Sequence, residues 1–294
     1  MSQEITRDWL QSFQSQVESK STFQKAKTIS FTSGKGGVGK TSASLKFAKL
    51  LALKGYRTLL IDCDYNLSNT AVKLGLPINN SFFTMAITGK SFDEVLHKDG
   101  NFHLLPACNG SYEIFDQNFD WDKIIIDIIS SHEADYDYII LDSSAGLNKS
   151  SLTLSAYCDY RFFVVTPDKS SITDSYSLIK ILKQRYGISE NHLLLNKVSS
   201  KKQYCRLVKT LTDTVDQFLS ARLNILGGIP LMSGSVDEFD RELLNIAGSK
   251  IESSFSKIVE KFTEENIGTF VSLSAANPVN TTVSGFEQEV QSSI

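Results

Sequence analysis

The sequence predicts an α/β fold, with a doubly wound and mostly parallel sheet flanked by helices. Short apolar runs rich in β-branched residues alternate with longer segments of helical periodicity. Glycine-rich and acidic segments directly follow several of these runs. Such alternation is typical of crossover units, in which parallel strands are buried on both faces of the sheet.

Six apolar runs are expected to form strands. In chain order they are Thr28–Thr32, Thr58–Ile61, His103–Pro106, Tyr138–Leu141, Phe162–Thr166 and His192–Leu195. Helical periodicity is clearest in three intervening segments, Lys40–Lys54, Ile172–Lys183 and Gln203–Leu219. Because ligands of such sheets bind beyond the carboxyl ends of the strands, functional residues are expected directly after these runs.

The composition is that of a globular protein and disfavours several classes. Of the 294 residues, 41% are hydrophobic, and the formal net charge of −3 argues against a surface that binds nucleic acid throughout. The four cysteines lie far apart, and the N-terminus lacks the apolar segment of a secretory signal. No apolar run approaches the roughly 20 residues that span a bilayer. We therefore expect a cytoplasmic protein.

Three parts are expected along the chain. Residues 1–24 carry an apolar stripe at helical spacing, which predicts a helix that either packs on its own domain or docks on a partner. Residues 25–262 hold the strand and helix pattern and form the main domain. Residues 263–294 are rich in Ser, Thr and Asn and are expected to form a disordered tail.

A phosphate-binding loop is predicted directly after the first strand. Within residues 33–42, Gly34, Gly39, Lys40 and Thr41 satisfy the pattern GxxxxGK[ST]. Glycines at this spacing let successive backbone N–H groups point at phosphate oxygens, and the following helix adds the positive end of its dipole. Lys40 is expected to reach the β- and γ-phosphates, and the Thr41 hydroxyl to bind Mg²⁺. The predicted nucleotide-binding set also includes Gly36, Gly37, Val38 and Ser42.

Aspartates follow the second and the fourth predicted strand. Asp62 and Asp64 come just past the second strand, and Asp142 ends the fourth. Carboxylates in such buried places are costly unless they have a partner or a metal. Parallel strands end at the same edge of a sheet, so these side chains should face the phosphate loop, where Asp142 would hold a water molecule of Mg²⁺. A helix N-cap is the alternative for Asp64, and a surface turn for Asp142.

These motifs resemble those of the MinD/ParA family of P-loop ATPases. The resemblance extends over about residues 27–262. Residues 35–41, KGGVGKT, resemble the deviant Walker A motif of the family. Residues 62–69 resemble its DxDxGxxN motif, with Asn66 where the family usually has glycine. The resemblance implies the family fold and a weak, Mg²⁺-dependent hydrolysis of ATP.

The resemblance also implies roles for single residues. Lys35 would reach the nucleotide of the other subunit in an ATP-dependent homodimer, the alternative being contact with its own nucleotide or with solvent. Asp64 would orient the attacking water, and Asp62 would support Mg²⁺ through its water shell. Asn196 ends the last predicted strand and would hydrogen-bond the adenine edge beneath a loop containing Pro230, unless it is an ordinary turn asparagine.

Within the family, three segments resemble the branch called FlhG, YlxH or FleN, which controls flagellar number and placement. They are residues 101–110, 137–147 and 164–180. This implies contact with the SRP-type GTPase FlhF or with flagellar basal-body and regulator proteins, although the FlhF-activating helix of the branch is matched here only at Asp8. The alternatives are a MinD-type division-site ATPase, a ParA-type ATPase that partitions DNA or cargo, and a scaffold that binds nucleotide without hydrolysis.

Two surface features leave alternatives open. Residues 249–262 form a predicted amphipathic helix, which either packs on the sheet or makes a weak contact with the inner face of the cytoplasmic membrane. A basic cluster near another predicted helix consists of Lys201, Lys202, Arg206 and Lys209. A solvated helix face is favoured over a DNA site, because two of the four residues are adjacent rather than helically spaced. DNA is therefore not an expected partner.

Overall fold

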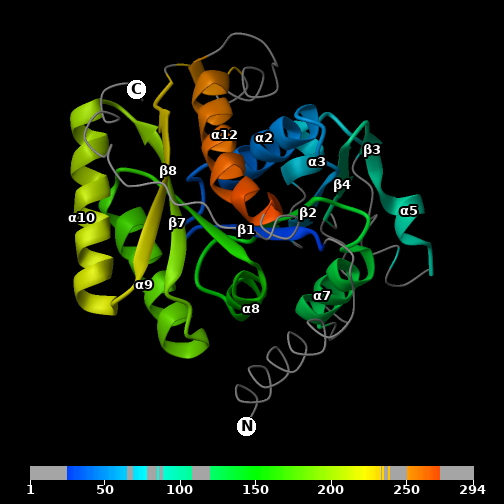
Figure 1. The fold of residues 1–294 in the computed structure, drawn as a ribbon, viewed down its shortest axis with the longest axis horizontal. Helices are drawn as coiled ribbons and strands as arrows, with labels where there is room; N and C mark the ends of the chain where they lie inside the picture. The colour runs from blue at the N-terminus through cyan, green and yellow to red at the C-terminus, as the bar shows by residue number, and fades with distance from the viewer. Residues whose placement is uncertain are drawn as a thin grey trace.

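The centre of the molecule is an eight-stranded sheet in the order β3-β4-β2-β5-β1-β6-β7-β8. The computed structural model describes residues 25–64, 69–77, 85, 89–107, 120–232, 234, 238 and 250–271. All neighbouring strands run parallel except β3 and β4. This arrangement confirms the predicted doubly wound, mostly parallel sheet (Figure 1).

Six strands lie where the apolar runs predict them. They are β1 (Lys27–Thr32), β2 (Thr58–Cys63), β4 (Phe102–Leu105), β5 (Tyr138–Ser143), β6 (Tyr160–Val165) and β7 (Glu190–Val198). The two edge strands are not among the predicted ones, β3 (His97–Asp99) and β8 (Arg222–Pro230). β3 contains no large apolar residue, and β8 contains two adjacent glycines and a proline, which are depleted in strands.

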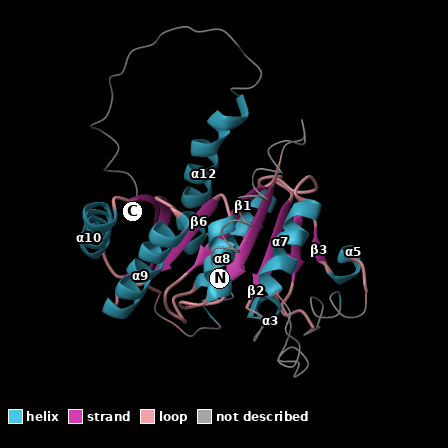
Figure 2. Cartoon of the chain, turned by 90° about the horizontal axis from the view of Figure 1, so that it is seen from below, coloured by secondary structure: helices cyan, strands magenta, loops and turns pink. Residues whose placement is uncertain are grey.

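Helices cover both faces of the sheet (Figures 1 and 2). One face carries α2 (Lys40–Leu53) and α12 (Lys250–Val271). The other carries α7 (Trp121–His132), α8 (Lys149–Tyr157), α9 (Lys169–Tyr186) and α10 (Lys201–Leu219). Two short helices, α3 (Asn69–Lys73) and α5 (Phe92–Val95), follow β2 and precede β3, respectively. Among the described helices, none combines the length and the apolar character needed to cross a bilayer.

The helix α12 packs against the sheet and α2 rather than exposing its apolar face. Five of its side chains are at most 2% exposed: Ile251, Phe255, Ile258, Val259 and Phe262. This confirms the packed alternative for residues 249–262, because the face considered for lipid contact is buried. The helix also continues to Val271, past the predicted boundary at residue 262. The predicted N-terminal helix in residues 1–24 and the tail from residue 272 lie outside the described residues.

The carboxyl edge of the sheet brings three strands of the predicted site together. β1 leads into the phosphate loop, and its neighbour β5 pairs in turn with β2. Asp62 of β2 and Asp142 of β5 are partners in this register. Both strands extend one residue further, through Cys63 and Ser143, so the aspartates lie within strands and not just past them. Each is held level with the other by backbone pairing, not by a flexible loop.

Candidate nucleotide-binding site

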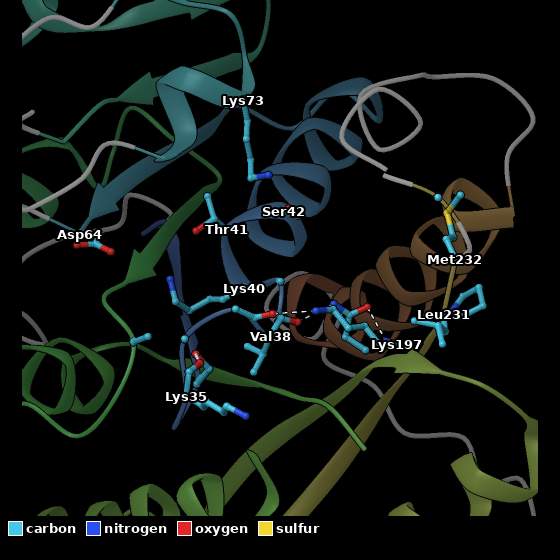
Figure 3. A pocket seen from close by; sticks show the side chains of 18 of the residues that line it. Lys35, Val38, Lys40, Thr41, Ser42, Asp64, Lys73, Lys197, Leu231 and Met232 are labelled. Atoms are coloured by element: carbon cyan, nitrogen blue, oxygen red, sulfur yellow. Dashed lines mark hydrogen bonds between the residues drawn. The ribbon is translucent and has the colours of Figure 1, made fainter. Parts of the chain in front are cut away.

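A cavity of about 630 Å³ opens at this edge of the sheet (Figure 3). Its volume is typical of a small-molecule site. The phosphate loop contributes Ser33 and residues 35–42 to its lining. The other walls come from the carboxyl ends of β7 and β8 and from residues that follow β2, β5 and β8. They include Asp64, Ala145, Asn196, Lys197, Pro230, Leu231 and Met232. The structure therefore brings most of the predicted site residues around one cavity.

The glycines of the loop are required for different reasons. Gly37 and Gly39 have φ angles of 76° and 90°, a left-handed backbone that costs other residues about 1–2 kcal/mol. A Cβ at position 39 would also collide with the side-chain amide of Asn196. Gly34 is required for close packing instead, because a Cβ at this position would collide with the backbone of Asp174 and Ser175 in α9. Two glycines thus shape the loop, and the third lets α9 approach it.

A buried ion pair lies at the base of the loop. The Nζ of Lys40 is 2.7 Å from Oδ1 of Asp142, and the two side chains are 7% and 1% exposed. The pair links the first turn of α2 to β5. Taking both charges out of water offsets much of their attraction, so such a pair stabilises the fold weakly and indicates a functional demand. Oδ2 of Asp142 is buried and accepts no hydrogen bond from the described residues.

Asp62 adds a second buried carboxylate to this ion pair. Burial, and then repulsion from Asp142, raises the pKa of Asp62 to about 7. The hydroxyl of Thr70 donates to Oδ2 of Asp62 at 2.5 Å, and the backbone N–H of Asp64 donates to Oδ1 at 3.1 Å. Asp62 therefore fixes the residues on both sides of segment 65–68. Two carboxylates share one lysine, so a bound cation would relieve the excess negative charge.

The donor set fits Mg²⁺. This ion prefers oxygen ligands and keeps several of its water molecules. Thr41, which lines the cavity, offers a hydroxyl, and Asp62 and Asp142 offer carboxylates. The unused Oδ2 of Asp142 is a buried acceptor suited to a metal-bound water. Within the described part of the chain, His, Cys, Asp and Glu form no cluster of three that could hold a metal alone. Phosphate oxygens and water would therefore complete the coordination.

Lys35 contacts its own chain in this structure. Its Nζ donates to Oδ1 of Asp168 at 3.2 Å and to Oγ of Ser170 at 2.8 Å. Both acceptors lie at the start of α9, where Asp168 is the N-cap residue. Hydrogen bonds from Thr166 and Ser170, and from the Ser171 backbone, lower the pKa of Asp168. Lys35 is thus held by a charged carboxylate, and its reach into a partner subunit stays a prediction.

The end of β7 contacts the opposite side of the loop (Figure 3). Nδ2 of Asn196 donates to the carbonyl of Val38 at 2.7 Å, and the Asn196 side chain is 2% exposed. The Nζ of Lys197 donates to the carbonyl of Gly37 at 2.9 Å. The contact between Asn196 and adenine stays a prediction, since the amide is engaged by the loop here. Pro230 lines the cavity from the end of β8, not from the predicted loop.

Sequence reasoning missed several residues of this site, among them Thr70, Asp168, Ser170 and Lys197. Hydroxyl and acidic residues near helix starts are common caps, so the first three carry no distinguishing signal. Lys197 had one, because it directly follows a predicted strand whose carboxyl end lies at the ligand-binding edge.

A family model and several known proteins match this chain over more than half of its length. A family model described as an AAA domain matches residues 26–194. The antiactivator FleN of Pseudomonas aeruginosa is 32% identical over 204 residues, which are 69% of this chain and 72% of FleN. The flagellum site-determining protein YlxH of Helicobacter pylori is 30% identical over 216 residues, 69% of each chain. The residues matched by the family model include the phosphate loop and both motif strands, β2 and β5.

Solved structures share the fold. The septum site-determining protein MinD of Pyrococcus horikoshii, complexed with Mg-ADP, has a TM-score of 0.67 at 21% identity and covers 82% of this chain and 97% of its own. The MinC:MinD complex of Aquifex aeolicus matches with a TM-score of 0.61 at 25% identity, over 87% of this chain and 99% of its own. Together with the phosphate loop and the paired aspartates, these findings show that the chain belongs to the MinD/ParA family of P-loop ATPases and resembles its FleN and YlxH members.

Proposed function

We propose that this protein is a weak, Mg²⁺-dependent ATPase that works as an ATP-dependent dimerisation switch. The observation that carries the proposal is the buried pair of Lys40 and Asp142, with Asp62 opposite, beneath a cavity lined by the phosphate loop. Buried charges of this kind stabilise a fold poorly, so a ligand that uses them is the simplest reason for their presence. Membership of an ATPase family supports ATP as that ligand.

Each residue then has a chemical task. The N–H groups of the loop would bind phosphate oxygens, and Lys40 would neutralise charge on the β- and γ-phosphates. Thr41, Asp62 and Asp142 would hold Mg²⁺, which when bound neutralises the charge that develops during phosphoryl transfer. Asp64 lines the cavity and would orient the attacking water. Hydrolysis is expected to be slow, because Lys40 is the one lysine that is ion-paired with the buried carboxylates among the described residues.

Lys35 would link hydrolysis to assembly. It is half-exposed on the loop, and release from Asp168 and Ser170 would free it to enter the site of a second copy. A cation supplied in trans stabilises the transferring phosphoryl group, as an arginine finger does. Loss of the γ-phosphate would remove these contacts, so the dimer would separate after hydrolysis.

Sizing chromatography with ATP or ADP tests this switch. The wild type is expected to dimerise with ATP and not with ADP, and Asp64→Ala is expected to accumulate as the ATP dimer because it binds without hydrolysis. Lys35→Ala should bind ADP yet stay monomeric with ATP. Lys202→Ala removes one exposed positive charge from α10 and serves as the control. A wild type that stays monomeric with Mg-ATP would contradict the proposal.

We further propose that the ATP-bound dimer controls the number or placement of flagella. The similarity to FleN and YlxH and the string at residues 164–180 support this role. FlhF or flagellar basal-body and regulator proteins would be its partners, with action in the cytoplasm or at the inner face of the membrane. Deletion of the gene should change flagellar number or position in electron micrographs, and complementation with the wild type should restore both. An unchanged pattern would refute this role and leave the ATPase proposal standing.

A further inference from the structure

We propose that Lys197 is a positioning residue for the phosphate loop, and that the bulged end of β7, residues 196–198, joins this loop to the opposite wall of the nucleotide cavity. The inference rests on the proposed function, because it assumes that the loop binds phosphate. It concerns a residue outside both sequence motifs, on a strand that ends across the cavity from Asp64 (Figure 3).

Two successive residues at this end of β7 donate to two successive carbonyl groups of the loop. Nζ of Lys197 donates to the carbonyl of Gly37 at 2.9 Å, and Nδ2 of Asn196 donates to that of Val38 at 2.7 Å. Carbonyl groups that are engaged from outside leave the N–H groups of a glycine-rich loop free to converge on an anion. This pair of hydrogen bonds, here called the clamp, therefore favours the loop conformation that binds phosphate.

The backbone of Lys197 is strained in a way that serves this clamp. Its φ angle is 58°, which is rare for a residue other than glycine, asparagine or aspartate. In this conformation the Lys197 N–H donates to Oδ1 of Asn196 at 2.8 Å. Because that oxygen already accepts a hydrogen bond, the amide presents Nδ2 to Val38, and only one orientation satisfies both contacts. Strain that persists at a ligand site indicates a positioning role.

The same end of β7 also holds the far wall of the cavity. The backbone N–H of Leu231 donates to the carbonyl of Val198 at 2.8 Å. Leu231 and its neighbour Met232 line the cavity, and Leu231 is 56% exposed. The loop and this apolar wall are thus both bonded to three consecutive residues. Loss of the Lys197 ammonium should loosen the loop without removing any side chain from the wall.

The experiment compares two probes on the full-length chain. Calorimetry would measure dissociation constants for Mg-ADP and for inorganic tripolyphosphate, which has no base. Lys197→Met keeps most of the aliphatic chain but removes the ammonium, and it should weaken binding of both probes by about 3- to 10-fold. The loss should appear in the KM for ATP more than in turnover at saturating ATP. Lys197→Arg should restore most of the affinity.

Three control variants separate the ammonium from other effects. Lys197→Gly relieves the backbone strain and should raise the melting temperature of the free protein, yet bind both probes as weakly as Lys197→Met. Met232→Ala alters the apolar wall and should weaken Mg-ADP binding but not tripolyphosphate binding. Lys202→Ala removes an exposed positive charge from α10 and should change neither dissociation constant.

Several results would overturn the inference. If Lys197→Met bound tripolyphosphate as tightly as the wild type, Lys197 would act on the base or not at all. If Lys197→Gly bound as tightly as the wild type, the backbone conformation at this position and not the ammonium would matter. A wild type that binds Mg-ADP but not tripolyphosphate would also overturn it, because the loop would not hold phosphate by itself. A wild type that binds neither probe would instead refute the proposed function.

Discussion

At the carboxyl edge of the sheet, Lys40, Asp62 and Asp142 bury charges that do not balance, whereas the layer beneath α12 buries aromatic rings around His192. The two regions respond to pH in opposite directions. Because the folded pKa of Asp62 is raised to about 7, its stabilising contribution in the free protein is present below pH 4 and is lost as pH rises through 7. The pKa of His192 is lowered to about 4, so its contribution is present above pH 6.5 and is lost as pH falls through 4.

This difference shows how one sheet divides two requirements. The edge keeps charged groups in a costly place, because a phosphate ligand and its metal need them there. The aromatic layer carries no such demand and can pack for stability alone. Phe262 lies at its centre. The centroid of its ring is 5.1 Å from the ring centroid of Phe162 and 5.0 Å from that of Tyr160. Variants in the two regions should therefore separate stability from chemistry.

The largest effect on stability is expected from Phe262→Ala. This side chain is fully buried, and its loss should lower the free energy of unfolding by about 3–5 kcal/mol in urea titrations. The dissociation constant of the folded protein for Mg-ADP should change less than about 2-fold, well below one power of ten. The matched control is Phe218→Ala, at a ring that is 67% exposed, which should stay within about 0.5 kcal/mol. Weak nucleotide binding by folded Phe262→Ala would show that the two regions are not separable.

The opposite pattern is expected from Asp142→Asn at the edge. Loss of this buried charge should slow ATP hydrolysis by on the order of 10²–10³-fold, because it acts where charge develops in the reaction. The free energy of unfolding should fall less than in Phe262→Ala, since Asp62 remains as a partner for Lys40. Asp213→Asn, on the exposed surface of α10, is the control. Phosphate release at the wild-type rate in Asp142→Asn would remove this residue from the mechanism.

A smaller, pH-dependent effect is expected from His192→Leu. The buried neutral imidazole must be protonated in acid, so between pH 6.5 and 4 the wild type should lose about 2–3 kcal/mol of stability through this group. The variant should lack that loss, because leucine does not titrate. Urea titrations at pH 7, 5.5 and 4.5 would measure the difference between the two stability curves. Parallel curves would show that His192 is not the group that titrates.

The smallest effects on stability are expected from single methyl groups in the loop. Gly34→Ala must displace the backbone of α9 and should cost about 1–3 kcal/mol. Gly36 has a permitted backbone and no described neighbour within 4 Å of an added Cβ, so Gly36→Ala should stay within about 0.5 kcal/mol. Weakened ATP binding or dimerisation in Gly36→Ala would then report a contact with ligand or partner. If Gly36→Ala unfolds the free chain, this contrast between the two glycines is wrong.

Sequence patterns predicted the parts of the fold that depend on local chemistry. Continuous apolar runs marked six strands, because central parallel strands are buried on both faces. The edge strand β8 was not predicted, since Gly227, Gly228 and Pro230 are typical of a loop. Its pairing with β7 depends on tertiary contacts that the local pattern does not contain. The same holds for α12, whose burial could not be told from lipid contact by periodicity alone.

The candidate site divides along the same line. The spacing of residues within one segment predicted the loop from Gly34 to Thr41. Asp62 and Asp142 were predicted beside it because ligands of parallel sheets bind at the carboxyl ends of the strands. The contacts of Lys35 with Asp168 and of Lys197 with Gly37 join residues more than a hundred positions apart. No local pattern specifies such a pairing, because it depends on how α9 and β7 are set against β1.

Gly34 packs so closely against α9 that there is no space between the loop and the helix for even one added methyl group. The start of the same helix carries the side chains that accept hydrogen bonds from Lys35. Gly34 and Lys35 therefore both contact α9. The helix α9 runs back along the sheet and ends at its C-cap residue Gly187, at the edge remote from the cavity. The loop could therefore not move toward α9 without displacing the first turns of this helix, so a triphosphate must be accommodated by movement of the loop away from α9 or of both together.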